Sequence, residues 1–175
     1  MHVPHDYVDA VIEVYRVLHA CNIPGVVQCS SLQVDGAHYC LAARQSRRNH
    51  PLAKCKQTAP HSHSVRLLLT PVGANTRPQD LPEVLTFTQE LLGTLGKLHK
   101  AGLVHRDICL ANIIRHERWY LIDFEVAASV NSPIWWTCEA LYLDPGTPWT
   151  AAMDLGMLEE ALRKLPEESL WKELE

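Results

Sequence analysis

The sequence lacks the features that mark secreted, membrane-spanning or nucleic-acid-binding proteins. Its net charge of -4 gives no reason to expect nucleic acid as a partner, because neutralising phosphates requires a basic surface. No apolar run approaches the ~18 to 20 residues that a membrane-spanning helix needs. No basic cluster followed by an apolar core opens the chain, as a secretory signal would. These absences predict a protein of the cytoplasm or nucleus that does not cross a membrane.

The cysteines and histidines give no strong metal or disulfide pattern. The six cysteines form no CxxC pair, which indicates free thiols in a reducing compartment rather than a disulfide framework. His61 and His63 lie near Cys55 and suggest zinc, but no second ligand pair has usable spacing. Solvated loop histidines are therefore the preferred interpretation of this cluster.

Apolar residues at helical spacing predict three helices. Asp6 is expected to cap the first helix, and Pro82 suits the first position of the second. Within the second helix, Gly93 and Gly96 each cost about 0.8 to 1 kcal/mol relative to Ala. We therefore expect close packing of another element against these glycines. The predicted helices cover residues 6–20, 82–101 and 151–164.

The remaining patterns predict strands and one polar loop. The Asp-Gly pair at 35–36 supplies the positive φ angles of a tight turn and predicts a β-hairpin. A short apolar run predicts a buried strand over 65–73. Between them, residues 44–64 carry five Arg or Lys and no apolar period, which favours a solvated basic loop. Binding to an acidic partner and nuclear import are the alternatives for this loop. Helices and strands together predict an α+β fold.

One segment, 104–127, carries oxygen-bearing side chains at spacings that suit phosphoryl transfer. Asp107 is followed five residues later by Asn112, and Asp123 comes eleven residues after that. Phosphoryl transfer needs a carboxylate that orients and deprotonates the attacking hydroxyl, and oxygen ligands that hold magnesium against the phosphates. Asp107 therefore suits the catalytic base, and Asn112 and Asp123 suit the metal ligands.

A predicted β-hairpin explains how these side chains meet. Residues 113–115 and 119–122 are apolar runs on either side of a polar turn at 116–118. Such a hairpin returns Asp123 to the neighbourhood of Asn112. Taken singly, each of these polar residues would be interpreted as a turn residue or a strand terminator; together they favour a site.

These motifs resemble those of the protein kinase-like superfamily. HRDICLAN (105–112) is similar to the catalytic loop H-R-D-x-x-x-x-N, and LIDFE (121–125) to the metal motif D-F-G. VRLLLTPVG (65–73) resembles the hinge strand between the kinase lobes. The catalytic-loop sequence HRDICLANII is similar to that of divergent kinases found in fungi. The acid after Phe124 also occurs in the choline and aminoglycoside kinase branch.

The resemblance implies a protein kinase-like fold with ATP and magnesium as cofactors. Residues 1–73 would form a partial small lobe, in which Leu69, Thr70 and Val72 of the hinge strand contact the nucleotide. Residues 74–175 would form a truncated helical large lobe with the catalytic loop, the metal motif, a short activation segment and the first buried helix.

Two further positions follow from the same resemblance. Glu139 is expected in the place of the A-P-E glutamate, with Arg163 as a speculative partner. Asp154 is expected in the place of the buried aspartate that steadies the backbone of the catalytic loop.

The sequence departs from the family pattern in ways that bear on activity. It contains no G-x-G-x-x-G loop and no V-A-I-K-like strand. Val14 occupies the place of the helix glutamate, and Glu13 is one residue off, which rotates its side chain by about 100°. Cys109 replaces a lysine. Glu125 replaces the D-F-G glycine, where it should restrict the backbone or add a metal ligand.

Three functions are compatible with this pattern. The first is ATP- and magnesium-dependent phosphoryl transfer to a protein Ser or Thr, with weak or lost activity. The second is a pseudokinase that acts as a binding or regulatory module, and the third is a non-functional kinase fragment. A protein substrate or a regulatory protein is the expected partner. A lobe that ends after its first buried helix is also expected to associate through exposed apolar surface.

Overall fold

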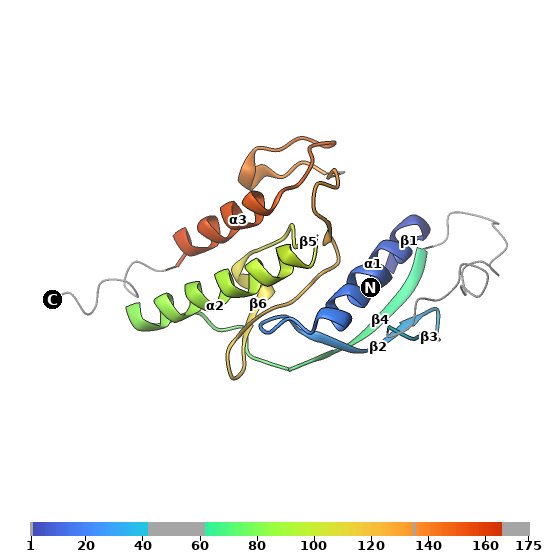
Figure 1. Cartoon of the computed structure of the whole chain (residues 1–175), viewed down its shortest axis with the longest axis horizontal. Helices are drawn as coiled ribbons and strands as arrows, with labels where there is room; N and C mark the ends of the chain where they lie inside the picture. Colours follow the sequence, from blue (N-terminus) through green and yellow to red (C-terminus); the bar gives the residue numbers. More distant parts are fainter. Residues whose placement is uncertain (1, 42–61, 135, 166–175) are drawn as a thin grey trace. The chain divides into compact units, whose positions relative to one another are not determined.

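The computed structural model describes residues 2–41, 62–134 and 136–165 (Figure 1). The chain divides into two compact units, the first comprising Met1–Asn22 with Gln28–Pro71 and the second comprising Ile23–Val27 with Val72–Glu175. The sequence placed its boundary after residue 73, two residues later. The basic loop predicted over 44–64 lies mostly outside the described residues.

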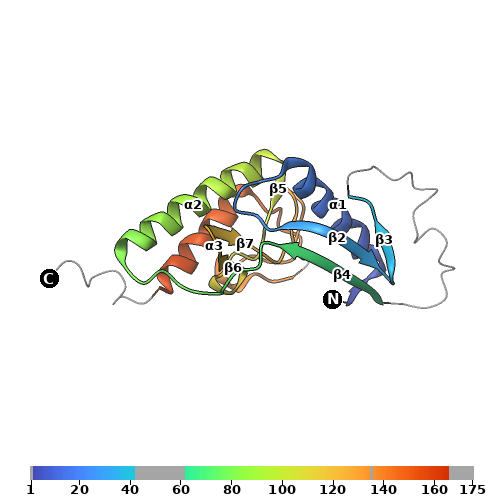
Figure 2. The same ribbon diagram turned by 90° about the horizontal axis from the view of Figure 1, so that it is seen from below.

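The first unit is a four-stranded sheet with one helix packed on it. The sheet has the order β1-β4-β2-β3, and all of its pairs are antiparallel. The helix α1 (His5–Cys21) packs on β2 and β4 (Figure 2). It buries its apolar stripe of Val8, Val11, Ile12, Tyr15 and Leu18. The strands are β1 (His2–Pro4), β2 (Gln28–Val34), β3 (Ala37–Tyr39) and β4 (Ser62–Thr70).

The predicted hairpin is confirmed, because β2 and β3 pair around the Asp-Gly turn. Asp35 and Gly36 have φ angles of 49° and 82°, and Val34 lies opposite Ala37. The Asp35 carboxylate also accepts a hydrogen bond from the Ser64 N–H at 2.9 Å. This bond ties the turn to β4, which contains Leu69 and Thr70, two of the cofactor-binding residues predicted from the sequence.

Three boundaries in the first unit differ from the prediction. The helix α1 begins at His5, so Asp6 lies inside its first turn and is not its N-cap. Strand β1 was not predicted at all; it pairs with β4 through the register Val3↔His63. The strand predicted over 65–73 is β4, which begins earlier and ends at Thr70 because Pro71 has no N–H to extend the ladder.

The second unit is built around α2 (Leu81–Lys100). Asp80 caps this helix, since its side chain accepts from the Glu83 N–H at 2.8 Å. Gly102, with a φ of 80°, follows its end as predicted. The helix α3 (Ala151–Arg163) lies beside α2 (Figure 1). None of the described helices is long and apolar enough to cross a bilayer.

Short strands and turns complete the second unit and carry the site. Strand β5 pairs with β8, and β6 pairs with β7 as the predicted hairpin. Two single turns of 3-10 helix precede β6 and α3, respectively. The strands are β5 (Leu103–Val104), β6 (Ile113–Arg115), β7 (Trp119–Leu121) and β8 (Ala128–Ser129), and the turns are η3 (Leu110–Asn112) and η4 (Glu139–Leu141).

The expectation that another element packs against the glycines of α2 is wrong. Among the described residues, a Cβ at Gly93 or Gly96 would meet nothing within 4 Å. The close approach to α2 involves Gly25 instead, whose added Cβ would lie 2.1 Å from Thr94 Oγ1. Thr94 also donates to the Pro24 carbonyl at 3.2 Å. Segment Ile23–Val27 therefore packs against α2 through glycine and threonine.

Candidate active site

The catalytic-loop residues predicted from the sequence meet in the second unit. The Asn112 side-chain amide donates to the Asp107 backbone carbonyl at 3.0 Å and to the Asp107 carboxylate at 2.7 Å. The η3 turn positions Asn112, because its N–H donates to the Cys109 carbonyl at 3.0 Å. Asp107 and Asn112 are both half-buried. The carboxylate and the amide therefore form one unit that faces partly into solvent.

The β6–β7 hairpin brings Asp123 next to this pair along the backbone. Ile113 lies opposite Leu121, and the Ile122 N–H extends the ladder by donating to the Asn112 carbonyl at 3.0 Å. Asp123 is the next residue, and it is exposed with a φ of 64°. A left-handed backbone is uncommon in a residue other than glycine, and it tends to occur at functional sites. The hairpin itself is confirmed as predicted.

The buried His105 ring connects the backbone of Asp107 with the backbone just before Asp123. The ring is 0% exposed. The Nε2 donates to the Ile122 carbonyl at 3.0 Å, and the Nδ1 accepts from the Asp107 N–H at 3.3 Å. Phe124 packs edge-on against the ring, with centroids 4.6 Å apart. Burial lowers the pKa of His105 below its ordinary value, against the opposing effect of Asp154, and this favours the neutral ring that the two hydrogen bonds require.

The Asp154 carboxylate holds the backbone that precedes Asp107. This side chain is 0% exposed and accepts from the N–H groups of His105 and Arg106 at 2.8 and 3.0 Å. It also accepts from the Trp149 indole and the His99 ring, both at 2.9 Å. Burial raises the pKa of Asp154, but the hydrogen bonds from His99 and from the two N–H groups outweigh burial and hold it below its ordinary value.

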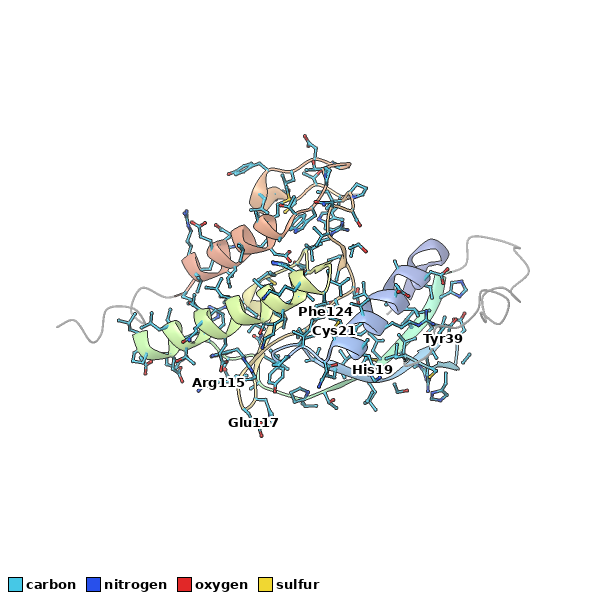
Figure 3. All side chains as sticks on the ribbon, in the orientation of Figure 1. His19, Cys21, Tyr39, Arg115, Glu117 and Phe124 are labelled. Carbon is cyan, nitrogen blue, oxygen red and sulfur yellow. The ribbon has the colours of Figure 1, made fainter. Side chains whose placement is uncertain are left out.

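Aromatic and charged side chains anchor the β6–β7 hairpin on α2. Trp119 packs edge-on against Phe87, with centroids 4.9 Å apart, and its N–H donates to the Glu90 carboxylate at 2.9 Å. The Arg115 guanidinium lies over the Trp119 ring at 5.1 Å and bonds Glu83 of α2. Figure 3 marks Arg115 on this hairpin and Phe124 in the segment that follows it. The hairpin that precedes Asp123 is thus fixed to α2.

Comparisons with known proteins concern the sequence and the fold of the chain. No protein-family model matches the chain. It is 40% identical over 70 residues to Crinkler effector protein 8 of Phytophthora infestans, covering 38% of this chain and 12% of the effector. It is 35% identical over 57 residues to the non-specific serine/threonine protein kinase Cdc7 of Drosophila melanogaster, covering 31% of this chain and 8% of the kinase.

A solved structure gives the overall comparison. The chain is similar to the structure of the Cydia pomonella Granulovirus kinase PK-1, with a TM-score of 0.58 and 15% identity, over 87% of this chain and 54% of the viral kinase. The protein has a protein kinase-like fold. The α+β fold class and the kinase-like fold that the sequence resemblance implied are confirmed. The chain spans about half of the viral kinase and about a tenth of the two curated relatives.

Within this kinase-like fold, the predicted nucleotide-binding residues lie where β4 ends. Leu69 is half-buried and pairs with Cys29, and Thr70 is exposed and pairs with Gln28. Both belong to the first unit. Val72 belongs to the second unit and is 82% exposed. Their contact with a nucleotide stays a prediction.

The structure shows the surroundings of the residues that depart from the kinase pattern at positions 13, 14 and 109. The Val14 side chain is buried, whereas Glu13 is 58% exposed and bonds Arg16 on its own helix at 3.4 Å. Glu13 therefore points to solvent, as its shifted position predicted. Cys109 is half-buried and lines a cavity of about 180 Å³ beside Met157.

The expected pair of Glu139 and Arg163 is not formed, and the zinc cluster suggested by the sequence can be checked only at His63. Glu139 is exposed in η4, and Arg163 bonds Glu159 at 2.6 Å rather than Glu139. Within the described part of the chain, no group of three or more His, Cys, Asp or Glu is placed to hold a metal ion. The His63 ring bonds Asp35, and the other members of the suggested zinc cluster lie outside the described residues.

Sequence reasoning missed Asn75 and His99. The Asn75 side-chain amide donates to the carbonyls of Leu110, Ala111 and Ile113 at 2.9, 3.1 and 2.9 Å. Nothing in the sequence distinguishes this residue from an ordinary turn asparagine. His99 lies in the last turn of α2, where a basic residue suits the helix dipole, so its bond to Asp154 also gave no separate signal.

Proposed function

We propose that this protein is an ATP-dependent phosphotransferase that acts on a hydroxyl of a protein Ser or Thr. Asp107 is the base that accepts the hydroxyl proton, and Asn112 and Asp123 hold magnesium. The observation that carries this proposal is the bond of 2.7 Å between the Asn112 amide and the Asp107 carboxylate. It joins a candidate base to a candidate metal ligand, with Asp123 one residue beyond the backbone partner of Asn112.

The donor atoms suit magnesium. Magnesium prefers oxygen ligands, and it commonly takes one or two carboxylates together with substrate phosphates. Because the Asn112 nitrogen is engaged by Asp107, its amide oxygen is the atom left for a cation. Burial and the nearby charge of Asp123 raise the pKa of Glu125, and a divalent cation would relieve this repulsion. When bound, magnesium would neutralise charge on the phosphates.

The rest of the machinery is proposed to orient Asp107 rather than to react. His105 holds the Asp107 N–H and the carbonyl before Asp123 through its two ring nitrogens. Asp154 holds the preceding backbone. Orientation of this kind supplies a large part of the catalysis in phosphoryl transfer. The similarity of 57 residues to a serine/threonine protein kinase supports a protein hydroxyl as acceptor.

A binding or regulatory module without turnover is the second candidate. The observation that favours it is Glu13, which bonds Arg16 instead of a lysine that would pin the phosphates. Loss of one preorganised charge in an active site typically lowers the rate by about 10² to 10³. Nucleotide binding with negligible transfer would identify this module, and a regulatory protein would then be its partner. We propose the cytoplasm or nucleus as its location, which imaging of a tagged protein tests.

The experiment that tests the proposed function measures binding and transfer separately. Magnesium and ATP should raise the melting temperature of the wild type by mass action. This shift should be abolished in Asp123→Asn and retained in Asp144→Asn, which changes an exposed carboxylate away from the site. Transfer of labelled γ-phosphate to a protein substrate should be lost in Asp107→Asn. A wild type without a shift at millimolar ATP would contradict the nucleotide site.

A further inference from the structure

Segment 73–75 is bound to strand β6 of the β6–β7 hairpin through an isolated antiparallel β-bridge between Ala74 and Arg115. The Ala74 N–H donates to the Arg115 carbonyl at 2.9 Å, and the Arg115 N–H donates back to the Ala74 carbonyl at 2.8 Å. Gly73 makes this approach possible, because an added Cβ would lie 2.5 Å from the Arg115 carbonyl oxygen. The backbone next to Asn75 is therefore fixed on the strand that follows Asn112.

Asn75 uses this position to bind both sides of Asn112. Two of its acceptors, the carbonyls of Leu110 and Ala111, belong to the residues just before Asn112. The third, the carbonyl of Ile113, belongs to the residue just after it. A single side chain that holds carbonyls before and after Asn112 limits the movement of the backbone between them, which contains Asn112. The conformation of that backbone determines where the Asn112 amide points.

We propose that Asn75 is a positioning residue that orients Asn112 for metal binding. By holding the η3 turn, Asn75 directs the Asn112 nitrogen to Asp107 and leaves the amide oxygen for the cation. The metal part of this inference rests on the proposed function. The structural part, that the bond between Asn112 and Asp107 depends on Asn75, can be tested without a nucleotide.

Two variants and one matched control separate this role from a general loss of stability. Asn75→Ala removes the donor, and Asn75→Asp replaces it with acceptors that repel the three carbonyls. Thr76→Ala is the control, because it truncates the next exposed residue, whose N–H bond to the Ala74 carbonyl is made by the backbone and is retained.

Amide hydrogen exchange tests the structural part. The Asn112 N–H bonds Cys109 and the Ile122 N–H bonds the Asn112 carbonyl, so both report opening of this loop. Loss of the Asn75 bonds should accelerate exchange at these two amides by about tenfold. Amides of β2 and β4 should exchange as in the wild type. Equal rates at Asn112 in Asn75→Ala and Thr76→Ala would overturn the inference.

The magnesium dependence of ATP binding tests the metal part. At saturating ATP, Asn75→Ala should need several-fold more magnesium than Thr76→Ala for half of the maximal rise in melting temperature. A merely structural role would lower all melting temperatures and leave this magnesium midpoint unchanged, and that result would overturn the inference. If the wild type shows no shift with magnesium and ATP, the proposed function fails, and the exchange rates alone decide whether Asn75 positions Asn112.

Discussion

The Asn112 amide and the Asp107 carboxylate are joined by a hydrogen bond of 2.7 Å, and this bond makes the position of each group depend on the other. A second bond from the same amide, to the Asp107 backbone carbonyl at 3.0 Å, closes the loop on itself. Both bonds require a donor at position 112. Aspartate has the same shape as asparagine but lacks the N–H donor, so Asn112→Asp tests how much these two bonds contribute to stability.

Asn112→Asp is expected to destabilise the protein at neutral pH, by about 1 to 2 kcal/mol, because it places a second carboxylate against Asp107 and removes the donor. Repulsion raises the folded-state pKa of the pair above its unfolded value, so the penalty is present at neutral pH and shrinks as pH falls through that raised pKa. Urea denaturation at pH 7 and near pH 4.5 measures this. Gln89→Glu, an exposed change on α2, is the control, and an equal penalty at both pH values would contradict the account.

Asp154→Asn is expected to lower the free energy of unfolding by about 3 kcal/mol or more. The carboxylate accepts from four donors in a fully buried position, and an amide would turn its own N–H groups towards some of them. Asp144→Asn, at an exposed position, should change stability by less than about 0.5 kcal/mol. Urea denaturation of both variants makes the comparison. Similar stabilities would show that the bonds to the catalytic loop contribute little.

Stability should also fall on mild acidification because of His105. Burial lowers its pKa in the folded state, so below about pH 6.5 the unfolded chain binds the proton more readily. The contribution is present in full above the unfolded pKa and is lost as pH falls towards the lower folded pKa. Between pH 7.5 and 5.5, the wild type should lose more stability than His105→Gln, as measured by urea denaturation. Parallel losses in the two proteins would assign the pH dependence to other histidines.

Local patterns were enough to predict the elements that carry the candidate site. The β6–β7 hairpin follows from two apolar runs around a polar turn, and the Asp35-Gly36 turn follows from its need for positive φ angles. The position of Asp154 came from the family resemblance, and its bonds to the catalytic loop agree with it. These features depend on residues close in sequence or on motifs with few alternatives.

Features that depend on distant contacts could not be predicted. Strand β1 forms because β4 offers it a free edge, and its own three residues carry no strand pattern. Asn75 gains its role from carbonyls more than thirty residues away. Gly25 differs from the glycines of α2 by its positive φ and by its contact with the Thr94 side chain, and both features depend on the folded backbone. In each case the partner determines the role of the residue.

The α2 glycines therefore predict a gain in stability. Gly93→Ala and Gly96→Ala should each raise the free energy of unfolding by about 0.5 to 1 kcal/mol, because alanine favours the helix and its Cβ meets nothing within 4 Å. Gly25→Ala should destabilise the protein, since Gly25 has a φ of 85° and its Cβ would clash with Thr94. Thermal unfolding of the three variants gives the signs. Destabilisation by Gly93→Ala would indicate that a partner packs against α2.

Association through exposed apolar surface is the last prediction, and α2 is the helix on which we place it. Leu85 and Leu92 are 62% and 47% exposed and lie two turns apart, on the same face of the helix. We propose that this face, together with the open surface at Gly93, contacts a partner protein or a second copy of the chain.

Replacing both leucines with glutamine should reduce self-association in sedimentation velocity experiments, with little change in unfolding free energy because both side chains are already largely exposed. Lys97→Gln, at another exposed position of α2, is the matched control and should leave association unchanged. Association that persists in the double variant would place the contact on another surface. A wild type that stays monomeric at every concentration would leave a different protein as the partner of this face, to be sought by binding experiments with the double variant as the negative control.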